Sequence, residues 1–246
     1  MVLVHGWGGS FASTWQEPGV TDIVSESGFH VTGIDLLGHG TADKPHEPAA
    51  YADLAGYLLS RLPEEPVIAV GFSLGALTLA RAAIRSPERF IGLCFAGIGD
   101  GVFEPHKPEE TERILAGLEG RADPSDNVAR LFGQYGNREG NDPAALAAIL
   151  RRAPSEEITS VGLSTLTQPS LVAIGDKDFA FPSEKFSSSM PSSTLKILPR
   201  TDHFATPNSF SFIDALVQWL EENFSCVALH AVVWSCRTVL PISLKP

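Results

Sequence analysis

The chain alternates between short apolar runs and segments whose apolar residues recur at helical spacing. Segments between the runs carry apolar residues three and four positions apart and predict helices at 51–62, Leu74–Arg85 and 210–224. The runs themselves are typical of buried strands: Val2–Val4, 29–36, Val67–Phe72, Phe90–Ala96, 170–174 and 194–198. This alternation predicts an α/β fold, with a mostly parallel sheet covered by helices on both faces.

Residues 101–167 interrupt the alternation with a segment rich in Glu, Pro, Gly and Ala. Asp142 followed by Pro143 is a typical helix start, and the spacing predicts three short helices at 109–118, 127–135 and 143–152. We interpret 101–167 as a small helical lid over the carboxyl edge of the sheet, inserted into a core formed by 1–100 and 168–224. The alternative is a helical decoration that does not contact substrate.

Residues 225–246 form an atypical C-terminal tail. The stretch 227–234 is apolar and strand-like, but His230, Arg237 and Pro241 interrupt the pattern of the tail. Two interpretations stay open. The tail packs on the body or on a second subunit, as in a homodimer, or it is an appendage without function.

Composition and charge narrow the classes of partner. Hydrophobic residues make up 43% of the 246 residues, and the formal net charge is −11. That charge argues against nucleic acid, which clustered Lys and Arg would bind. No apolar run is long enough to span a bilayer, and no leader pattern follows Met1, so we expect a cytoplasmic protein. The three cysteines have no metal-ligand spacing, and no nucleotide or flavin motif is present, so we expect no metal and no cofactor.

The strongest chemical motif is Gly71-Phe72-Ser73-Leu74-Gly75. It stands between the predicted strand Val67–Phe72 and the predicted helix Leu74–Arg85. That context is typical of a nucleophile elbow, in which a serine projects from a tight strand-to-helix turn. The two glycines fit a turn where backbone and helix approach too closely for side chains. Ser73 is therefore the candidate nucleophile.

A glycine-rich loop, His5-Gly6-Trp7-Gly8-Gly9, follows the first strand directly. Such a loop can fold against the elbow and aim a backbone N–H at a substrate oxygen. The amides of Trp7 and Leu74 are the candidate oxyanion donors. His5 is expected to brace this loop by hydrogen bonding rather than to act as the catalytic base.

The order of these motifs resembles that of the α/β-hydrolase superfamily. The matching landmarks are His5–Gly9, Asp35–Gly40, Gly71–Gly75, Gly175–Asp178 and Asp202–Phe204. They cover the chain from Met1 to about Phe224. The His-Gly-Trp-Gly start is similar to that of small carboxylesterases, a group that includes the pimeloyl-carrier-protein methyl ester esterases. The resemblance implies an acyl-enzyme mechanism but does not name the substrate.

The triad acid and base are expected on loops after the last two strands. His203 follows the strand 194–198, where an imidazole can take the Ser73 proton. Three carboxylates are candidates for the acid. By resemblance to the family's G-D-x-D turn, Asp178 is the acid and Asp176 shapes the turn, while Asp100 is a further candidate.

The resemblance also implies two further strands before Val2–Val4, which are missing from this sequence. The strand 29–36 is then expected to be an exposed sheet edge.

We expect a serine carboxylesterase that acts on a small-molecule ester. The modest size of the lid and the apolar Trp7, Phe72 and Phe179, which we expect near the site, favour a short to medium acyl chain. Carbon–carbon bond hydrolysis or perhydrolysis on the same triad stays open, as does an inactive hydrolase-like binding protein.

Overall fold

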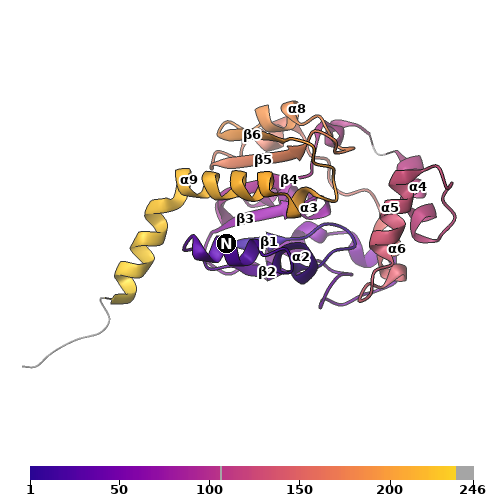
Figure 1. Cartoon of the computed structure of the whole chain (residues 1–246), viewed down its shortest axis with the longest axis horizontal. Helices are drawn as coiled ribbons and strands as arrows, with labels where there is room; N and C mark the ends of the chain where they lie inside the picture. Colours follow the sequence, from indigo (N-terminus) through magenta and orange to yellow (C-terminus); the bar gives the residue numbers. More distant parts are fainter. Residues whose placement is uncertain (106, 237–246) are drawn as a thin grey trace, which may run out of the picture.

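The computed structural model describes residues 1–105 and 107–236, with side chains as far as Phe224. Its centre is a six-stranded sheet in the order β2-β1-β3-β4-β5-β6 (Figure 1). Each neighbouring pair is parallel, as the alternation of strands and helices predicted. The strands are β1 (Val2–Val4), β2 (Thr32–Ile34), β3 (Val67–Phe72), β4 (Phe90–Ala96), β5 (Ser170–Gly175) and β6 (Ser193–Leu198).

Alternate residues of the central strands belong to two separate hydrophobic clusters, one on each face of the sheet. In β3, Val67 and Ala69 pack with helices α2 (Leu54–Arg61) and α3 (Leu74–Arg85). Ile68 and Val70 point to the opposite face. That face is covered by α1 (Val20–Glu26) and α9 (Phe210–Cys236). Because both faces of the sheet are buried, its central strands consist almost entirely of apolar residues.

Several element boundaries differ from the sequence prediction. The expected strand 29–36 shortens to β2, which forms one edge of the sheet. The expected helix 51–62 divides into the 3₁₀ turn η2 (Pro48–Tyr51) and α2. Asp53 separates them because its carboxylate accepts the N–H of Gly56, at 2.8 Å, and so caps α2. The short π-helix η1 (Ala12–Gln16) and α1 were not predicted.

The last helix corrects the strand-like interpretation of 227–234. α9 runs for 27 residues to Cys236, and in Figure 1 its final turns extend beyond the sheet. A helix that has already formed on the core continues without a new nucleation step, which favours helix over strand here. Residues 237–246 lie outside the described residues. Across the described ranges, no helix has the length and apolar character needed to cross a membrane.

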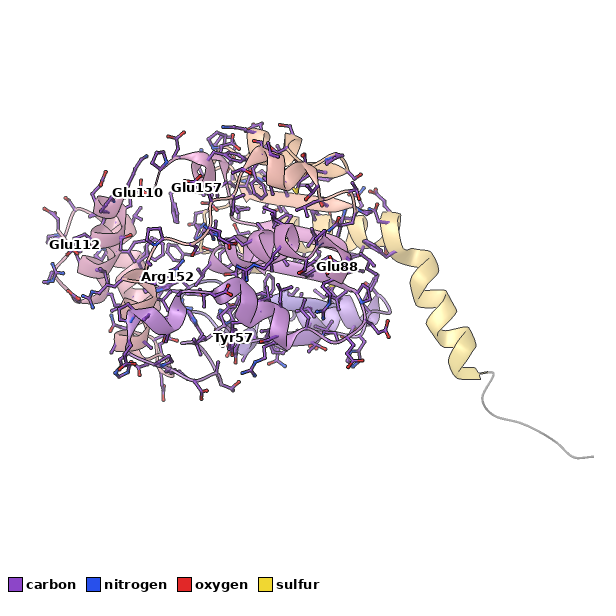
Figure 2. All side chains as sticks on the ribbon, turned by 180° about the vertical axis from the view of Figure 1, so that it is seen from behind. Tyr57, Glu88, Glu110, Glu112, Arg152 and Glu157 are labelled. Atoms are coloured by element: carbon purple, nitrogen blue, oxygen red, sulfur yellow. The ribbon has the colours of Figure 1, made fainter. Side chains whose placement is uncertain are left out.

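The helices between β4 and β5 gather at one end of the sheet. The segment comprises η4 (Asp100–Phe103), α4 (Pro108–Leu118), α5 (Asn127–Gly136), α6 (Pro143–Leu150) and α7 (Ser160–Ser164). We call residues 101–167 the helical insertion. Seen from behind, Glu110 and Glu112 of α4 lie at one end of the molecule, and Glu88, just before β4, lies towards the other (Figure 2). Asp142 accepts the N–H groups of Ala144 and Ala145 and so caps α6.

Two glycines allow α4 and α5 to pack backbone against backbone. A Cβ on Gly117 would lie 1.9 Å from the carbonyl oxygen of Ala129, and one on Gly133 would lie 2.2 Å from that of Gly117. Gly117→Ala should therefore force the helices apart and lower the free energy of unfolding by about 1–3 kcal/mol. Urea unfolding would measure the change. Gly101→Ala is the control, because a Cβ there meets nothing within 4 Å. Equal stabilities of the two variants would contradict this account of the contact.

Candidate active site

Ser73 lies in a strained turn between β3 and α3. Its φ of 51° and ψ of −114° lie outside the usual regions for a residue with a side chain. Its N–H donates to the carbonyl oxygen of Ala96 at 2.9 Å, which ties the turn to β4. A Cβ on Gly71 would lie 2.6 Å from the Gly75 oxygen, and one on Gly75 would lie 2.4 Å from the His5 oxygen. Neither position has room for a larger residue, which explains the Gly-x-Ser-x-Gly pattern.

A continuous chain of hydrogen bonds joins Ser73, His203 and Asp178. The Nε2 atom of His203 lies 2.9 Å from the Ser73 Oγ, and Nδ1 lies 3.0 and 2.9 Å from the two Asp178 oxygens. His203 is 4% exposed and Asp178 is 5% exposed, so water competes little for these bonds. A carboxylate can only accept, so the imidazole donates its Nδ1–H to Asp178. Nε2 is then free to accept the serine proton.

Asp178 is the one of the three candidate acids that contacts His203. Asp178 follows β5, and the N–H of Ala180 also donates to it, at 2.8 Å. Asp176 donates its backbone N–H to Leu198, and its Oδ1 is buried without a partner among the described residues. Asp100 instead accepts the N–H of Phe186, at 2.8 Å, at the start of the short helix α8 (Glu184–Ser188).

The glycine-rich loop after β1 lies against the nucleophile. A Cβ on Gly6 would be only 3.2 Å from the Cβ of Ser73. The loop is closed by a hydrogen bond of 3.1 Å from the Gly9 N–H to the Gly6 oxygen. In the described part of the chain, the amide N–H groups of Trp7 and Leu74 have no acceptor. Both are therefore available to a negatively charged oxygen beside Ser73.

His5 and His39 form a buried pair behind this loop. The His5 Nε2 accepts the N–H of Leu36 at 3.0 Å, and its Nδ1 donates to the Gly6 oxygen at 2.8 Å. His5 thus braces the loop, as expected. The His39 ring lies 4.8 Å from that of His5. Burial, followed by the nearby His5, lowers the pKa of His39 to about 3, so His39 is neutral in the folded protein.

Acid should destabilise the fold through His39. In the unfolded chain a histidine takes up a proton as the pH falls below about 6.5, whereas folded His39 stays neutral down to about 3. Above pH 6.5 the protonation of His39 therefore does not lower the free energy of unfolding. As the pH falls from 6.5 towards 3, the free energy of unfolding decreases by about 1.4 kcal/mol per pH unit. Urea unfolding between pH 7 and pH 4 should show a shallower pH dependence for His39→Gln. His30→Gln, at an exposed histidine, is the control for the substitution itself, and identical slopes for His39→Gln and the parent protein would contradict the prediction.

Aromatic side chains surround the imidazole of His203. The rings of Phe179, Phe72 and Phe204 lie 4.3, 5.1 and 5.6 Å from it, centre to centre. Phe132 of α5 reaches over from the helical insertion to 5.7 Å from Phe179. The sequence placed Trp7, Phe72 and Phe179 near the site but missed Phe132 and Phe204. No motif marks Phe132, whereas the position of Phe204 directly after His203 was a usable signal.

The helical insertion contacts the glycine-rich loop directly. The indole N–H of Trp7 donates to the carbonyl oxygen of Leu146 in α6 at 3.2 Å. The Asn141 side chain donates to the carbonyl oxygen of Gly8 at 2.8 Å. The insertion therefore lies over the carboxyl ends of the strands, beside Ser73.

The family model described as the alpha/beta hydrolase family matches residues 1–212, which is most of the chain. The chain belongs to the alpha/beta hydrolase family. Within this family, a serine at the turn after a central strand, hydrogen-bonded to a histidine, is the arrangement used for hydrolysis. The fold predicted from the sequence is confirmed.

Curated relatives point towards esterases but are distant. The chain is 28% identical over 177 residues to a pimeloyl-[acyl-carrier protein] methyl ester esterase of Proteus mirabilis, covering 68% of this chain and 65% of that protein. The protein of the same name from Pectobacterium carotovorum is 34% identical over 89 residues, or 36% of this chain and 32% of the relative. The chain therefore spans less than two thirds of the length of these alpha/beta hydrolase relatives.

Solved structures of several alpha/beta hydrolases share the fold. One is 2-hydroxy-6-oxo-6-phenylhexa-2,4-dienoate hydrolase from Rhodococcus sp. strain RHA1, with a TM-score of 0.66, 22% identity, and 91% and 89% of the two chains covered. Another is a thermophilic esterase from Thermogutta terrifontis, with a TM-score of 0.65, 21% identity, and 90% and 89% covered. At these identities the likeness concerns the fold alone, since one fold hosts many reactions.

Proposed function

We propose that this alpha/beta hydrolase is a serine carboxylesterase that cleaves short- to medium-chain carboxylic esters. The supporting observation is the buried chain of hydrogen bonds from Asp178 through His203 to Ser73. This arrangement turns a weakly nucleophilic hydroxyl into one that can attack a carbonyl carbon, because its proton has an acceptor at 2.9 Å.

The reaction follows from the roles of these groups. The Ser73 oxygen attacks the ester carbonyl carbon while His203 takes the serine proton, and the amides of Trp7 and Leu74 stabilise the oxyanion. The intermediate collapses, and His203 gives its proton to the departing alkoxide, which leaves as an alcohol. Water, deprotonated by His203, then attacks the acyl-Ser73 ester. The acid is released and the serine recovers its proton.

The substrate class is inferred from the surroundings of Ser73. Trp7, Phe132 and Phe179 form a connected aromatic cluster that can contact an apolar acyl chain. In the proposed enzyme the helical insertion 101–167 is a lid, because its α5 contributes Phe132 to this cluster and its α6 accepts the indole N–H of Trp7. The methyl ester esterase activity named for the curated relatives agrees with ester cleavage.

Two measurements on the same protein test this proposal. Hydrolysis of p-nitrophenyl esters from acetate to laurate should occur, with the highest kcat/KM among short to medium acyl chains. A fluorophosphonate probe should label the protein at Ser73. The labelling control is Ser164→Ala, which removes an exposed serine hydroxyl on α7 and should leave labelling unchanged.

The outcomes separate the esterase from its alternatives. Labelling of Ser73 without turnover of any ester would contradict the esterase proposal. It would favour a carbon–carbon bond hydrolase or a perhydrolase on the same triad. A folded protein that is neither labelled nor active would instead be a binding protein built on a hydrolase fold.

A further inference from the structure

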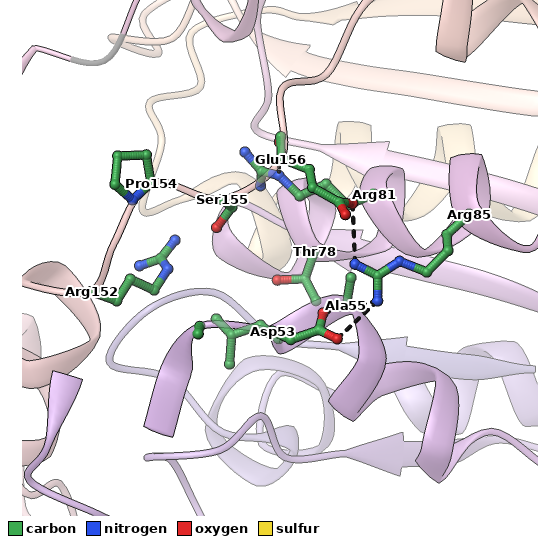
Figure 3. Close-up of a pocket in the computed structure, with 11 residues that line it drawn as sticks. Asp53, Ala55, Thr78, Arg81, Arg85, Arg152, Pro154, Ser155 and Glu156 are labelled. Carbon is green, nitrogen blue, oxygen red and sulfur yellow. Dashed lines mark hydrogen bonds and ion pairs between the residues drawn. The ribbon is translucent and has the colours of Figure 1, made fainter. Parts of the chain in front are cut away.

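A polar cavity lies between α2, α3 and the segment that follows α6. Its volume is about 290 Å³, and it is lined by residues of α2 and α3 and by residues 152 and 154–156, which follow α6 within the helical insertion (Figure 3). None of Ser73, Asp178 and His203 lines it. Arg81 lies eight residues after Ser73 on α3, or about 12 Å along the helix axis. The cavity is therefore separate from the candidate active site.

Arg81 projects into this cavity with most of its donors unused. Its Nε donates to the carbonyl oxygen of Glu156 at 2.7 Å, and one terminal nitrogen donates to that of Leu77 at 3.3 Å. A guanidinium has five N–H groups, so three remain. Within the described ranges, Arg81 forms no ion pair with a carboxylate. Burial, followed by repulsion from Arg152, lowers the pKa of Arg81 to about 10.

Arg152 lines the same cavity from the segment that follows α6. One terminal nitrogen donates to the carbonyl oxygen of Ile149, at the end of α6. Its Nε is buried and has no hydrogen-bond partner in the described part of the chain, where the side chain also has no carboxylate partner. Burial lowers the pKa of Arg152 as well. Two partly buried guanidinium groups that repel each other destabilise the folded protein unless an anion lies between them.

The carboxylates at the rim of the cavity are already paired. Arg85 binds Asp53 at 2.9 Å and Glu156 at 3.1 Å, as the dashed lines of Figure 3 mark. The lining therefore has three arginines against two carboxylates, and both carboxylates are held by the same arginine. This local excess of positive charge occurs in a chain of net charge −11. Ser155, half-buried beside Arg152, adds a hydroxyl that can donate.

We propose that this cavity binds a small oxyanion, a phosphate or carboxylate group, between Arg81 and Arg152. Guanidinium groups bind both kinds of oxyanion through paired N–H donors. The bound group would join α3, which begins at the elbow, to the segment that follows α6. It would thereby fix the segment between α6 and α7 of the helical insertion to the core.

Titration of the 246-residue chain with inorganic phosphate tests the proposal. Isothermal titration calorimetry at constant ionic strength should show saturable binding in the millimolar range, as a few charge-assisted hydrogen bonds allow. Succinate in place of phosphate distinguishes the two sources of the oxyanion, because tighter binding of succinate would assign a carboxylate. Absence of saturable binding for both anions to the wild-type chain would overturn the proposal.

Variants locate the binding site. Arg152→Leu and Ser155→Asp should each weaken binding by about ten-fold or more, the first by removing donors and the second by adding a negative charge. Ser155→Asp changes a partly exposed loop residue, so it serves if Arg152→Leu does not fold. Arg130→Leu removes an exposed arginine of α5 and should leave affinity unchanged. Equal affinity in the Ser155→Asp and Arg130→Leu proteins would place the anion elsewhere and overturn the assignment.

The proposal does not depend on the proposed esterase activity. Ser73→Ala should bind phosphate as tightly as the parent chain, so a failure of the esterase proposal would leave this result intact.

Discussion

Replacing Ser73 by alanine is expected to lower kcat for p-nitrophenyl ester hydrolysis by about 10⁶-fold, the scale seen when a triad nucleophile is removed. The variant has no oxygen that can form the acyl intermediate, so water must attack the ester directly. The amides of Trp7 and Leu74 would still stabilise the oxyanion, and a residual acceleration of about 10³-fold over the uncatalysed reaction should persist. Steady-state kinetics on purified protein, with active-site titration of the parent chain, measure this loss.

Ser164→Ala is the matched control for the kinetic experiment, because it removes another serine hydroxyl far from the elbow in sequence. Its kcat should equal that of the parent chain. If Ser73→Ala retained activity within ten-fold of the parent, Ser73 would not be the nucleophile. The acyl-enzyme mechanism would then be wrong.

Asp178→Asn is expected to lower kcat by about 10⁴-fold while leaving the fold intact. The Asp178 carboxylate accepts the Nδ1–H of His203 through both oxygens, at 3.0 and 2.9 Å. An asparagine amide can donate to Nδ1 instead, which moves the imidazole proton to Nε2. The nitrogen that faces Ser73 then carries a hydrogen and cannot take the serine proton.

Asp176→Asn provides the control within the same turn. Asp176 precedes Asp178 by two residues, but in the described part of the chain the carboxylate bonded to His203 is that of Asp178, and the Oδ1 of Asp176 has no hydrogen-bond partner. Its kcat should stay within about ten-fold of the parent value, since it holds no reacting group in place. If Asp176→Asn lowered kcat as much as Asp178→Asn, the assignment of Asp178 as the triad acid would be wrong. A pH–rate profile of each variant adds a second readout.

Most of the sheet could be predicted because its strands are buried on both faces. β3 and β4 were predicted with the boundaries that the structure shows, since nearly every residue in them is apolar. The edge strand β2 was overestimated, because apolar residues also flank it without forming ladder bonds. η1 and α1 were missed because residues 12–26 mix serine, threonine and charged residues around Gly19, a composition that periodicity alone does not resolve.

Local motifs predicted the hydrogen-bonded candidate residues better than the side chains around them. Ser73 and the loop after β1 are each defined by glycines that exclude a Cβ, so their geometry is visible in the sequence. Phe132 is brought to the site by packing between α5 and the core, and spacing along the chain does not report such contacts. The same holds for Arg81 and Arg152, whose proximity depends on where the chain leaves α6.

The sequence separation within the candidate triad has a consequence for how activity appears during synthesis. Ser73 and His203 are 130 residues apart, and His203 follows β6, the last strand among the described residues. A chain emerging from the ribosome therefore exposes its serine long before its imidazole exists. Contacts between residues so far apart in the sequence form late in folding. Recovery of hydrolysis after dilution from denaturant should consequently lag behind recovery of helix content, and catalysis would report that β5 and β6 have docked.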